Sequence, residues 1–227
     1  MITALITGAS GGLGRAFAIE AAQRGYDLVL TDVDARSLET FRQGLLRQFD
    51  VRVTAEACDV TDAADVARMF SVLRETGVRL NMLYNVAGVD YEGGFLDMEC
   101  EQVLDIVRVN IEGSMRMLHG AIRHRDPASR FTVVMVSSLA SLYPIPLKAT
   151  YAASKRFLLD FATSLSQELS GQNVSILTLC PGGLPTTAGA LQGINAQGFW
   201  GRATTNSLPV VARRTIDRAL RGKRLYI

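Results

Sequence analysis

A short apolar run that ends in a cluster of glycines begins this chain and limits what it can fold into. Residues 2–7, Ile-Thr-Ala-Leu-Ile-Thr, have the pattern of a buried strand. Glycines follow in the spacing Gly8-x-x-x-Gly12-x-Gly14, before residues 15–24, which are typical of a helix. A glycine loop between a strand and a helix presents backbone N–H groups and a helix N-terminus, which together bind phosphate. A tight turn without a ligand is the alternative, but the position between strand and helix favours a phosphate-binding loop.

Strand and helix patterns alternate along the rest of the chain. This alternation predicts an α/β fold of the Rossmann type, a doubly wound parallel sheet of about seven strands with helices on both faces. We expect a single domain over residues 1–227, with a functional lid at about 184–206. Further strands are expected at 27–32, 51–57, 80–84, 131–136, 174–179 and 225–227, and further helices up to about 49, up to about 76, and at about 100–124, 151–170 and 210–220.

Acidic side chains follow two of the predicted strands, at the edge of the sheet where ligands bind in open α/β folds. Asp32 ends the second strand and lies 18 residues beyond Gly14, near the offset of about 20 at which a carboxylate bonds an adenosine ribose. Helix capping is the alternative, because Asp32 or Asp34 could be the N-cap of the next helix, and both roles could hold, one for each aspartate. Asp59 follows the third strand and is expected at the same edge.

Tyr151 and Lys155 are four residues apart in a stretch that reads as the beginning of a helix, so they share one helix face. A free tyrosine has a pKa near ~10 and is a poor base at neutral pH, but a nearby ammonium favours the phenolate. The pair is therefore a candidate device for proton transfer, with an accidental tyrosine and lysine as the alternative. Lysine occurs only at positions 148, 155 and 223, in a chain rich in arginine, which indicates that a compact ammonium is needed at Lys155.

Composition and charge argue against several classes of function. The 24 basic and 22 acidic residues give a net charge of +2 without a basic cluster, so nucleic acid is not an expected partner. No apolar run is long enough to span a bilayer, and residues 1–7 lack the basic flank of a signal peptide, so no membrane is expected. Cys58, Cys100 and Cys180 lie far apart without metal-ligand spacing. They favour a reducing compartment, and we expect a cytoplasmic protein without a metal site.

Taken together and in order, these motifs resemble the short-chain dehydrogenase/reductase family, and the resemblance covers nearly the whole chain. Ser138 precedes Tyr151 by 13 residues, which is the usual interval in that family. Asn110 lies in the middle of a predicted helix, where asparagine is unfavourable and a polar partner is expected to compensate it. The matching motifs are Thr7-Gly8-x-x-x-Gly12-x-Gly14, Asp59, Asn85-x-Ala87-Gly88, Asn110, Ser138, Tyr151-x-x-x-Lys155 and Pro181-Gly182.

The resemblance implies that a hydride moves between a nicotinamide cofactor and a small alcohol or ketone. It implies that Tyr151 transfers the proton on the substrate oxygen and that Ser138 hydrogen-bonds this oxygen. Lys155 would hold the nicotinamide ribose and lower the pKa of Tyr151, and Asn110 would support a water that relays protons to Lys155. The implied cofactor-binding residues are Gly8, Ser10, Gly12, Leu13, Gly14, Asp32, Asp59, Val60, Asn85, Ala87, Gly88, Tyr151, Lys155, Pro181, Gly182, Leu184 and Thr186.

The charge of Asp32 predicts which cofactor is bound. Its carboxylate would accept a hydrogen bond from the free 2′-hydroxyl of NAD and repel the 2′-phosphate of NADP. Gly11 and Val33 stand at two positions where NADP-using relatives often carry arginine, and neither Arg15 nor Arg36 clearly cancels the charge of Asp32. We therefore expect NAD, with NADP as the alternative.

The sequence also predicts how the protein assembles, and it leaves one alternative to a catalytic function. The resemblance implies that the helices at 100–124 and 151–170 pair across a two-fold axis into a homodimer or homotetramer. Met115, Met117 and Phe157 support this, as apolar residues beyond what one sheet-facing stripe needs.

The alternative function is a dinucleotide-sensing or scaffold protein that binds without turnover, and the complete set of proton-transfer residues argues against it.

Three positions depart from the family pattern. Val86 replaces a frequent second asparagine, and Gly183 and Pro185 make the loop after Pro181 unusual. The substrate-facing side of the site is therefore the part of the chain about which the sequence says least.

Overall fold

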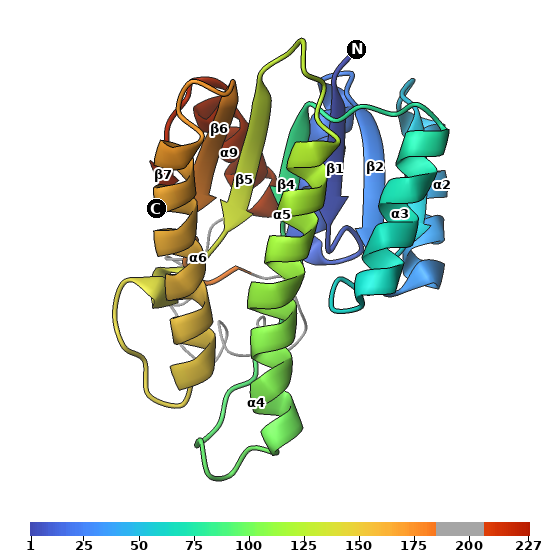
Figure 1. Ribbon diagram of the computed structural model, residues 1–227. Helices are drawn as coiled ribbons and strands as arrows, with labels where there is room; N and C mark the ends of the chain where they lie inside the picture. Colours follow the sequence, from blue (N-terminus) through green and yellow to red (C-terminus); the bar gives the residue numbers. More distant parts are fainter. Residues whose placement is uncertain (185–206) are drawn as a thin grey trace.

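A computed structural model of the chain describes residues 1–184 and 207–227 (Figure 1). At its centre lies a seven-stranded sheet in the order β3-β2-β1-β4-β5-β6-β7, with every neighbouring pair parallel. The chain changes direction of winding between β1 and β4, as doubly wound folds do. The predicted fold class is therefore confirmed. The strands are β1 (Thr3–Thr7), β2 (Asp27–Asp32), β3 (Val53–Ala57), β4 (Met82–Asn85), β5 (Phe131–Val136), β6 (Val174–Leu179) and β7 (Leu225–Tyr226).

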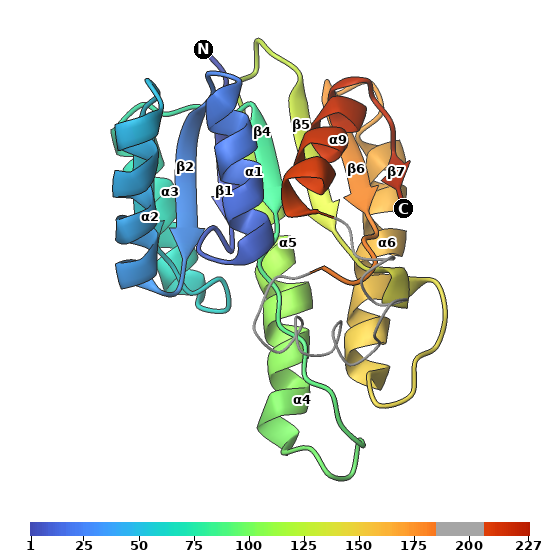
Figure 2. The same ribbon diagram turned by 180° about the vertical axis from the view of Figure 1, so that it is seen from behind.

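Helices cover both faces of the sheet, as the views from front and behind show (Figures 1 and 2). Successive strand residues point to opposite faces, so Ala4 and Ile6 pack into one core cluster and Leu5 into the other. Because both faces are buried, the strands read as continuous apolar runs and not as alternating patterns. One face carries α1 (Gly12–Gln23), α2 (Ala35–Gln48) and α9 (Leu208–Leu220), and the other carries α3 (Ala63–Glu75), α5 (Ser114–Arg123) and α6 (Ala149–Glu168).

The prediction of one continuous helix at about 100–124 is wrong in its middle part. The structure divides it into α4 (Cys100–Val107), a π-helical turn η1 (Arg108–Gly113) and α5. Asn110 lies in η1 and is fully buried, and its side-chain amide bonds the backbone of Val89 in the loop after β4. Wide π turns of this kind are frequent at functional sites. The poor helix former is thus compensated by polar partners, as the sequence predicted.

The assembly prediction needs one correction. Met117 is fully buried in the core beneath the sheet, so it offers nothing to a partner. Met115 and Phe157 are 37% and 36% exposed. The outward apolar surface of these helices is therefore smaller than the sequence suggested. Within the residues that the structure describes, no helix is both long and apolar enough to cross a membrane.

Two strand boundaries also differ from prediction. The third strand begins at Val53 and not at residue 51, because the Arg52 backbone N–H donates to the Asp27 carboxylate at 3.0 Å and does not join the ladder. The fourth strand begins at Met82 and includes Asn85, which places the Asn85 side chain at the strand end. Of the lid predicted at 184–206, only Leu184 falls within the described residues.

Candidate active site

The glycine loop has the backbone geometry that a bound phosphate needs. Gly8 has a φ of +63°, which favours glycine. A Cβ on Gly14 would overlap the carbonyl oxygen of Gly8, so the beginning of α1 can pack this closely only without a side chain. The hydroxyl of Ser10 is buried and has no hydrogen-bond partner among the described residues. Buried polar atoms are nearly always partnered, so this hydroxyl indicates a ligand.

Asp32 lies at the end of β2, and its carboxylate faces this loop. It accepts hydrogen bonds from the backbone N–H of Ser10 at 2.9 Å and of Asp34 at 3.2 Å. The N-cap of α2 is Asp34, which accepts from both the N–H and the hydroxyl of Ser37. The capping alternative for Asp32 is therefore wrong, because Asp34 fills that role and leaves Asp32 beside the nucleotide loop.

Thr7 joins the ends of β1 and β4 at the same edge of the sheet. Its hydroxyl donates to the side-chain oxygen of Asn85 at 3.1 Å and accepts from the N–H groups of Val86 and Ala87 at 2.9 and 3.0 Å. Sequence reasoning included Thr7 in a motif but gave it no role. The available signal was a threonine at the end of a buried strand, at the edge of the sheet where ligands bind.

Asp59 and Val60 follow β3, as predicted. The Asp59 carboxylate accepts from the backbone N–H and the hydroxyl of Thr61 at 2.8 and 2.7 Å, which fixes the turn before α3. Val60 is buried against Gly113 of η1. The adenine contact predicted for both residues stays a prediction.

Lys155 is buried, and its ammonium donates to the carbonyl oxygen of Val136 at 3.1 Å. Burial lowers the pKa of Lys155 to about 8. The ammonium lies 5.7 Å from the centroid of the Tyr151 ring, on the same face of α6. The two residues are therefore adjacent, as their spacing predicted.

The two serines after β5 have different partners. Ser137 donates its hydroxyl to the carbonyl of Lys155 at 2.7 Å, which anchors α6 to the sheet. Ser138 accepts from the Ala140 backbone N–H at 3.1 Å, and its hydroxyl lies on the side of Tyr151, where it acts to lower the pKa of the phenol. Ser138 thus lies beside the Tyr151 phenol, whereas the Ser137 hydroxyl is bonded to α6, and the catalytic role of Ser138 stays a prediction.

The pKa expected for Tyr151 is not what the structure gives. Burial raises the pKa of the phenol above its ordinary value, and this effect outweighs the opposing effects of Ser138 and Lys148. The expectation that the pKa of Tyr151 lies below its ordinary value is wrong for the free protein, and the effect predicted for Lys155 on this pKa stays a prediction. The Lys155 ammonium is directed to the carbonyl of Val136, and desolvation of the phenol is the larger effect.

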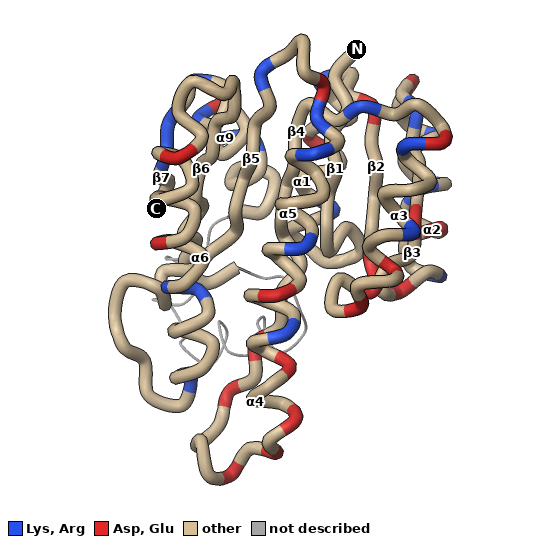
Figure 3. The backbone as a smooth tube through the Cα atoms, viewed as in Figure 1, with Lys and Arg blue, Asp and Glu red and all other residues tan. Residues whose placement is uncertain are grey.

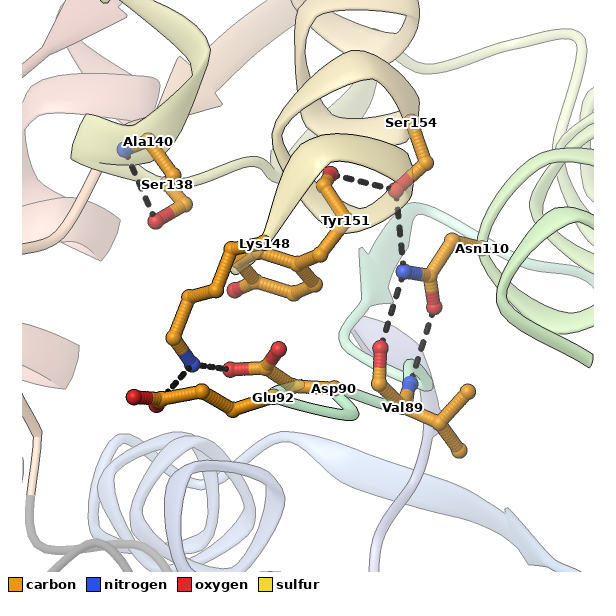
Figure 4. A network of polar contacts seen from close by, with 9 residues as sticks. All are labelled: Val89, Asp90, Glu92, Asn110, Ser138, Ala140, Lys148, Tyr151 and Ser154. Atoms are coloured by element: carbon orange, nitrogen blue, oxygen red, sulfur yellow. Dashed lines mark hydrogen bonds and ion pairs between the residues drawn. The ribbon is translucent and has the colours of Figure 1, made fainter. Parts of the chain in front are cut away.

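Asn110 connects the site to the loop after β4 (Figure 4). Its side-chain oxygen accepts from the Val89 N–H at 2.8 Å, and its amide donates to the Val89 carbonyl at 3.0 Å and to the Ser154 hydroxyl at 3.1 Å. Ser154 in turn donates to the carbonyl of Tyr151 at 2.7 Å. Asn110 thus holds this loop against the first turn of α6, and the predicted water relay through Asn110 stays a prediction.

Sequence reasoning missed a second lysine at the site. Lys148 precedes α6, and its ammonium lies 5.6 Å from the centroid of the Tyr151 ring. It forms ion pairs with Asp90 and Glu92, at 2.5 and 3.1 Å. The only signal in the sequence was that lysine is rare in this chain.

The remaining predicted residues lie at the end of β6. The Pro181 carbonyl accepts from the Leu139 N–H at 2.9 Å, Gly182 follows it, and Leu184 is buried in the core. Thr186 lies outside the described residues. Ala87 packs against Gly8, and a Cβ on Gly88 would lie 3.2 Å from the Lys155 ammonium, so the nucleotide loop and the proton-transfer residues form one continuous site.

The residues at this edge fit a nicotinamide dinucleotide. The glycine loop, the free hydroxyl of Ser10 and the carboxylate of Asp32 suit the adenosine half and the pyrophosphate. The phenol, hydroxyl and ammonium groups lie at the other end of the same edge. A doubly wound sheet with this site defines a class of dinucleotide-dependent oxidoreductases.

The chain belongs to the short chain dehydrogenase family, whose family model matches residues 2–194. It is 29% identical over 183 residues to a very-long-chain 3-oxoacyl-CoA reductase of Vanderwaltozyma polyspora, covering 76% of this chain and 52% of the relative. It is 31% identical over 184 residues to an NADPH-dependent 1-acyldihydroxyacetone phosphate reductase of Schizosaccharomyces pombe, covering 80% of this chain and 60% of the relative. The chain thus spans between half and two thirds of the length of these relatives.

Solved structures agree with the fold. A short-chain dehydrogenase from Sphingobium yanoikuyae in complex with NADPH has a TM-score of 0.88 and 26% identity, and the match covers 100% of this chain and 87% of that one. A short-chain dehydrogenase/reductase from Burkholderia phymatum in complex with NAD has a TM-score of 0.87 and 24% identity, with coverage of 99% and 87%. The two structures bind different nicotinamide cofactors, so the family alone does not decide between NAD and NADP.

Proposed function

We propose that this protein transfers a hydride between a nicotinamide cofactor and a small alcohol or ketone, with Tyr151 as the acid and base. The observation that carries the proposal is that the Tyr151 phenol lies by the Ser138 hydroxyl and its ring by two lysine ammonium groups, one of which borders the loop of Ala87 and Gly88 that packs on Gly8. A scaffold protein has no need for this arrangement of proton-transfer groups. The rival function, a dinucleotide sensor without turnover, would need only the loop and Asp32.

The cofactor supplies or accepts the hydride when it is bound, and the protein orients it and handles the proton. Gly8, Gly12, Gly14 and the Ser10 hydroxyl would hold the pyrophosphate, and Asp32 the adenosine ribose. Each of these groups lies at or beside the N-terminus of α1, where backbone N–H groups and the helix dipole favour phosphate.

Tyr151 carries out the proton transfer at the substrate oxygen. In reduction, the neutral phenol donates its proton to the developing alkoxide while the Ser138 hydroxyl hydrogen-bonds the same oxygen. In oxidation, the phenolate accepts the alcohol proton. General acid–base help of this kind is typically worth about 100- to 10,000-fold in rate. Lys155 holds the nicotinamide ribose and supplies positive charge near the phenol.

We infer that the group acted on is a ketone or the corresponding alcohol. The neutral Tyr151 phenol, whose pKa is raised by burial, is the form that donates a proton when the ketone is reduced. The names of the two yeast relatives describe reductases of a 3-oxoacyl-CoA and of 1-acyldihydroxyacetone phosphate, both of which carry a ketone. These names support a ketone as the group that is reduced.

We also propose NAD as the cofactor, in a cytoplasmic homodimer or homotetramer. Asp32 supports NAD, because its carboxylate would repel a 2′-phosphate.

Met115 and Phe157 support assembly, since they are large apolar side chains left partly exposed on α5 and α6. Light scattering at micromolar concentration tests the assembly, and a monomer would reject it. The exposed free thiol of Cys100 supports a reducing compartment.

The function is tested with a panel of ketones and alcohols, by following the absorbance of the reduced nicotinamide. We expect consumption of reduced cofactor with at least one class of ketone, and saturable binding of the cofactor in the absence of substrate. Cofactor binding without turnover across a broad panel would support the dinucleotide sensor instead.

A further inference from the structure

Two ammonium groups flank the ring of Tyr151, and the function proposed above uses only one of them. Lys155 lies 5.7 Å from the ring centroid and Lys148 lies 5.6 Å from it. Lys148 precedes Tyr151 by three residues and Lys155 follows it by four, so both reach the same side of α6. The two ammonium groups thus lie at nearly the same distance from the Tyr151 ring.

The surroundings of the two lysines differ. The Lys155 ammonium is buried and donates to a neutral carbonyl, that of Val136. Lys148 extends alongside the Tyr151 ring to the carboxylates of Asp90 and Glu92 (Figure 4). These two acids belong to the loop that leaves β4, and acidic residues continue from there onto α4 (Figure 3). Lys148 therefore pairs with acidic side chains close to the Tyr151 ring.

The backbone around Lys148 is held in place from both sides. The Leu147 carbonyl accepts a hydrogen bond from the Gly93 N–H at 2.9 Å, and Leu147 has a φ of 65°, which residues other than glycine rarely adopt. Such a conformation persists where surrounding contacts fix it, and it is frequent at functional sites. The residue before Asp90 is fixed in turn, because Asn110 bonds both backbone groups of Val89.

We propose that Lys148 is a positioning residue for Tyr151: it holds Asp90 beside the phenol and balances its charge, and the pair sets the proton affinity of the phenol. The proposal rests on the proposed role of Tyr151 as acid and base. Loss of Lys148 would leave the phenol near uncompensated carboxylates, which disfavour the phenolate. Loss of the Asp90 charge would remove a negative charge near the phenol and leave Glu92 as the ion-pair partner of Lys148, which favours the phenolate. The two changes thus have opposite signs.

The other charged and polar groups around Tyr151 are compatible with this effect of Lys148 and Asp90 on the phenol. Within the described residues, the groups near Tyr151 are the Ser138 hydroxyl after β5, Asp90 from the loop after β4, Lys148 before α6 and Lys155 on α6, while Glu92 faces Lys148 and the Cys180 thiol faces Lys155. The pKa of Lys148 is raised by its two carboxylates, whereas that of Lys155 falls to about 8. Above pH 8, Lys148 is therefore the ammonium beside the phenol that stays protonated. Lys148 lowers the pKa of Tyr151 and Asp90 raises it.

The test is a titration of the Tyr151 phenol in the free protein by NMR of tyrosine labelled with ¹³C at Cζ, with the signal assigned by its loss in Tyr151→Phe. We expect Lys148→Met to raise the midpoint and Asp90→Asn to lower it, each by about half to one pH unit. The proton-transfer step in the pH dependence of kcat should shift in the same two directions. Because the titration needs neither cofactor nor turnover, opposite shifts in an inactive protein would retain this inference and reject the proposed function.

Two matched variants separate charge from structure. Lys148→Arg keeps the cation and should leave the midpoint within about 0.3 pH unit of wild type. Arg156→Met removes a cation from the same helix, but Arg156 is solvent-exposed and paired with Asp160, so no shift is expected. If Lys148→Met fails to fold, Asp90→Asn alone decides. A midpoint that does not fall in Asp90→Asn, or that moves in the same direction in both variants, would overturn the inference.

Discussion

The carboxylate of Asp32 accepts a hydrogen bond from the backbone N–H of Ser10 at 2.9 Å, and this bond joins the end of β2 to the glycine loop. The bond fixes a negative charge where the adenosine ribose would lie. It also holds the loop in which the Ser10 hydroxyl has no described partner. Asp32 thus holds the glycine loop in place, and we propose that it also selects the cofactor.

This relationship predicts a cofactor preference. We expect wild type to bind NADH more tightly than NADPH, because a carboxylate at contact distance from a 2′-phosphate costs about 1 to 4 kcal/mol, depending on screening. Asp32→Ala should reduce the preference by about tenfold or more in fluorescence titrations with both reduced cofactors.

The control for this experiment is Asp34→Ala. It removes the carboxylate that caps α2 and should lower stability without changing the ratio of the two affinities. Tighter binding of NADPH by wild type, or an unchanged ratio in Asp32→Ala, would contradict the role given to Asp32.

Gly14 predicts a second, purely steric effect. A methyl group at this position would overlap the Gly8 carbonyl oxygen, so Gly14→Ala forces the loop away from α1. We expect a loss of about 2 kcal/mol or more in the free energy of unfolding and a loss of cofactor binding.

Gly44→Ala is the matched control, since Gly44 lies in α2 with nothing within 4 Å of its Cβ position. It should stabilise the protein by about 0.5 to 1 kcal/mol. Equal effects of the two substitutions in urea unfolding would show that this packing is unimportant.

The buried ammonium of Lys155 predicts a cost in stability. Its pKa is about 8 in the folded protein, against 10.5 for an ordinary lysine, so the folded state disfavours its charge. A shift of this size corresponds to about 3 kcal/mol below pH 8, offset by about 1 kcal/mol for its hydrogen bond to Val136. Lys155→Met should therefore stabilise the free protein at pH 7.

The pH dependence of this effect has a definite sign. Between pH 8 and 10.5 the unfolded chain keeps a proton on Lys155 that the folded chain has lost, so wild-type stability rises with pH relative to the variant. The advantage of Lys155→Met should consequently shrink between pH 8 and 10.5. Urea unfolding at pH 7 and pH 10 measures it, with Lys223→Met at an exposed position as the control. A variant that is less stable than wild type at pH 7 would contradict the account.

The alternation of strands and helices was sufficient to predict the sheet, because most of its parallel strands are short apolar runs followed by a helix. The spacing of Ser138, Tyr151 and Lys155 likewise predicted their meeting, since two of them share a helix face and the third ends a neighbouring strand. Such features are local or repeat along the chain. They can therefore be predicted from the sequence without knowledge of the tertiary structure.

The features that the sequence did not predict depend on contacts between distant segments. The π turn at Asn110 exists because its side chain meets Val89, which is 21 residues earlier. The raised pKa of Tyr151 follows from the burial of its phenol. The ion pairs of Lys148 join it to a loop 58 residues away. None of these partners is marked by a pattern near the residue itself.

The most direct test of the central claim is the steady-state kinetics of Tyr151→Phe with the best ketone substrate, together with cofactor binding by titration. The substitution removes only the hydroxyl that donates the proton. We predict that kcat falls by at least about 100-fold while the affinity for the cofactor stays within a few-fold of wild type. A kcat within a few-fold of wild type would contradict the assignment of Tyr151 as the acid and base.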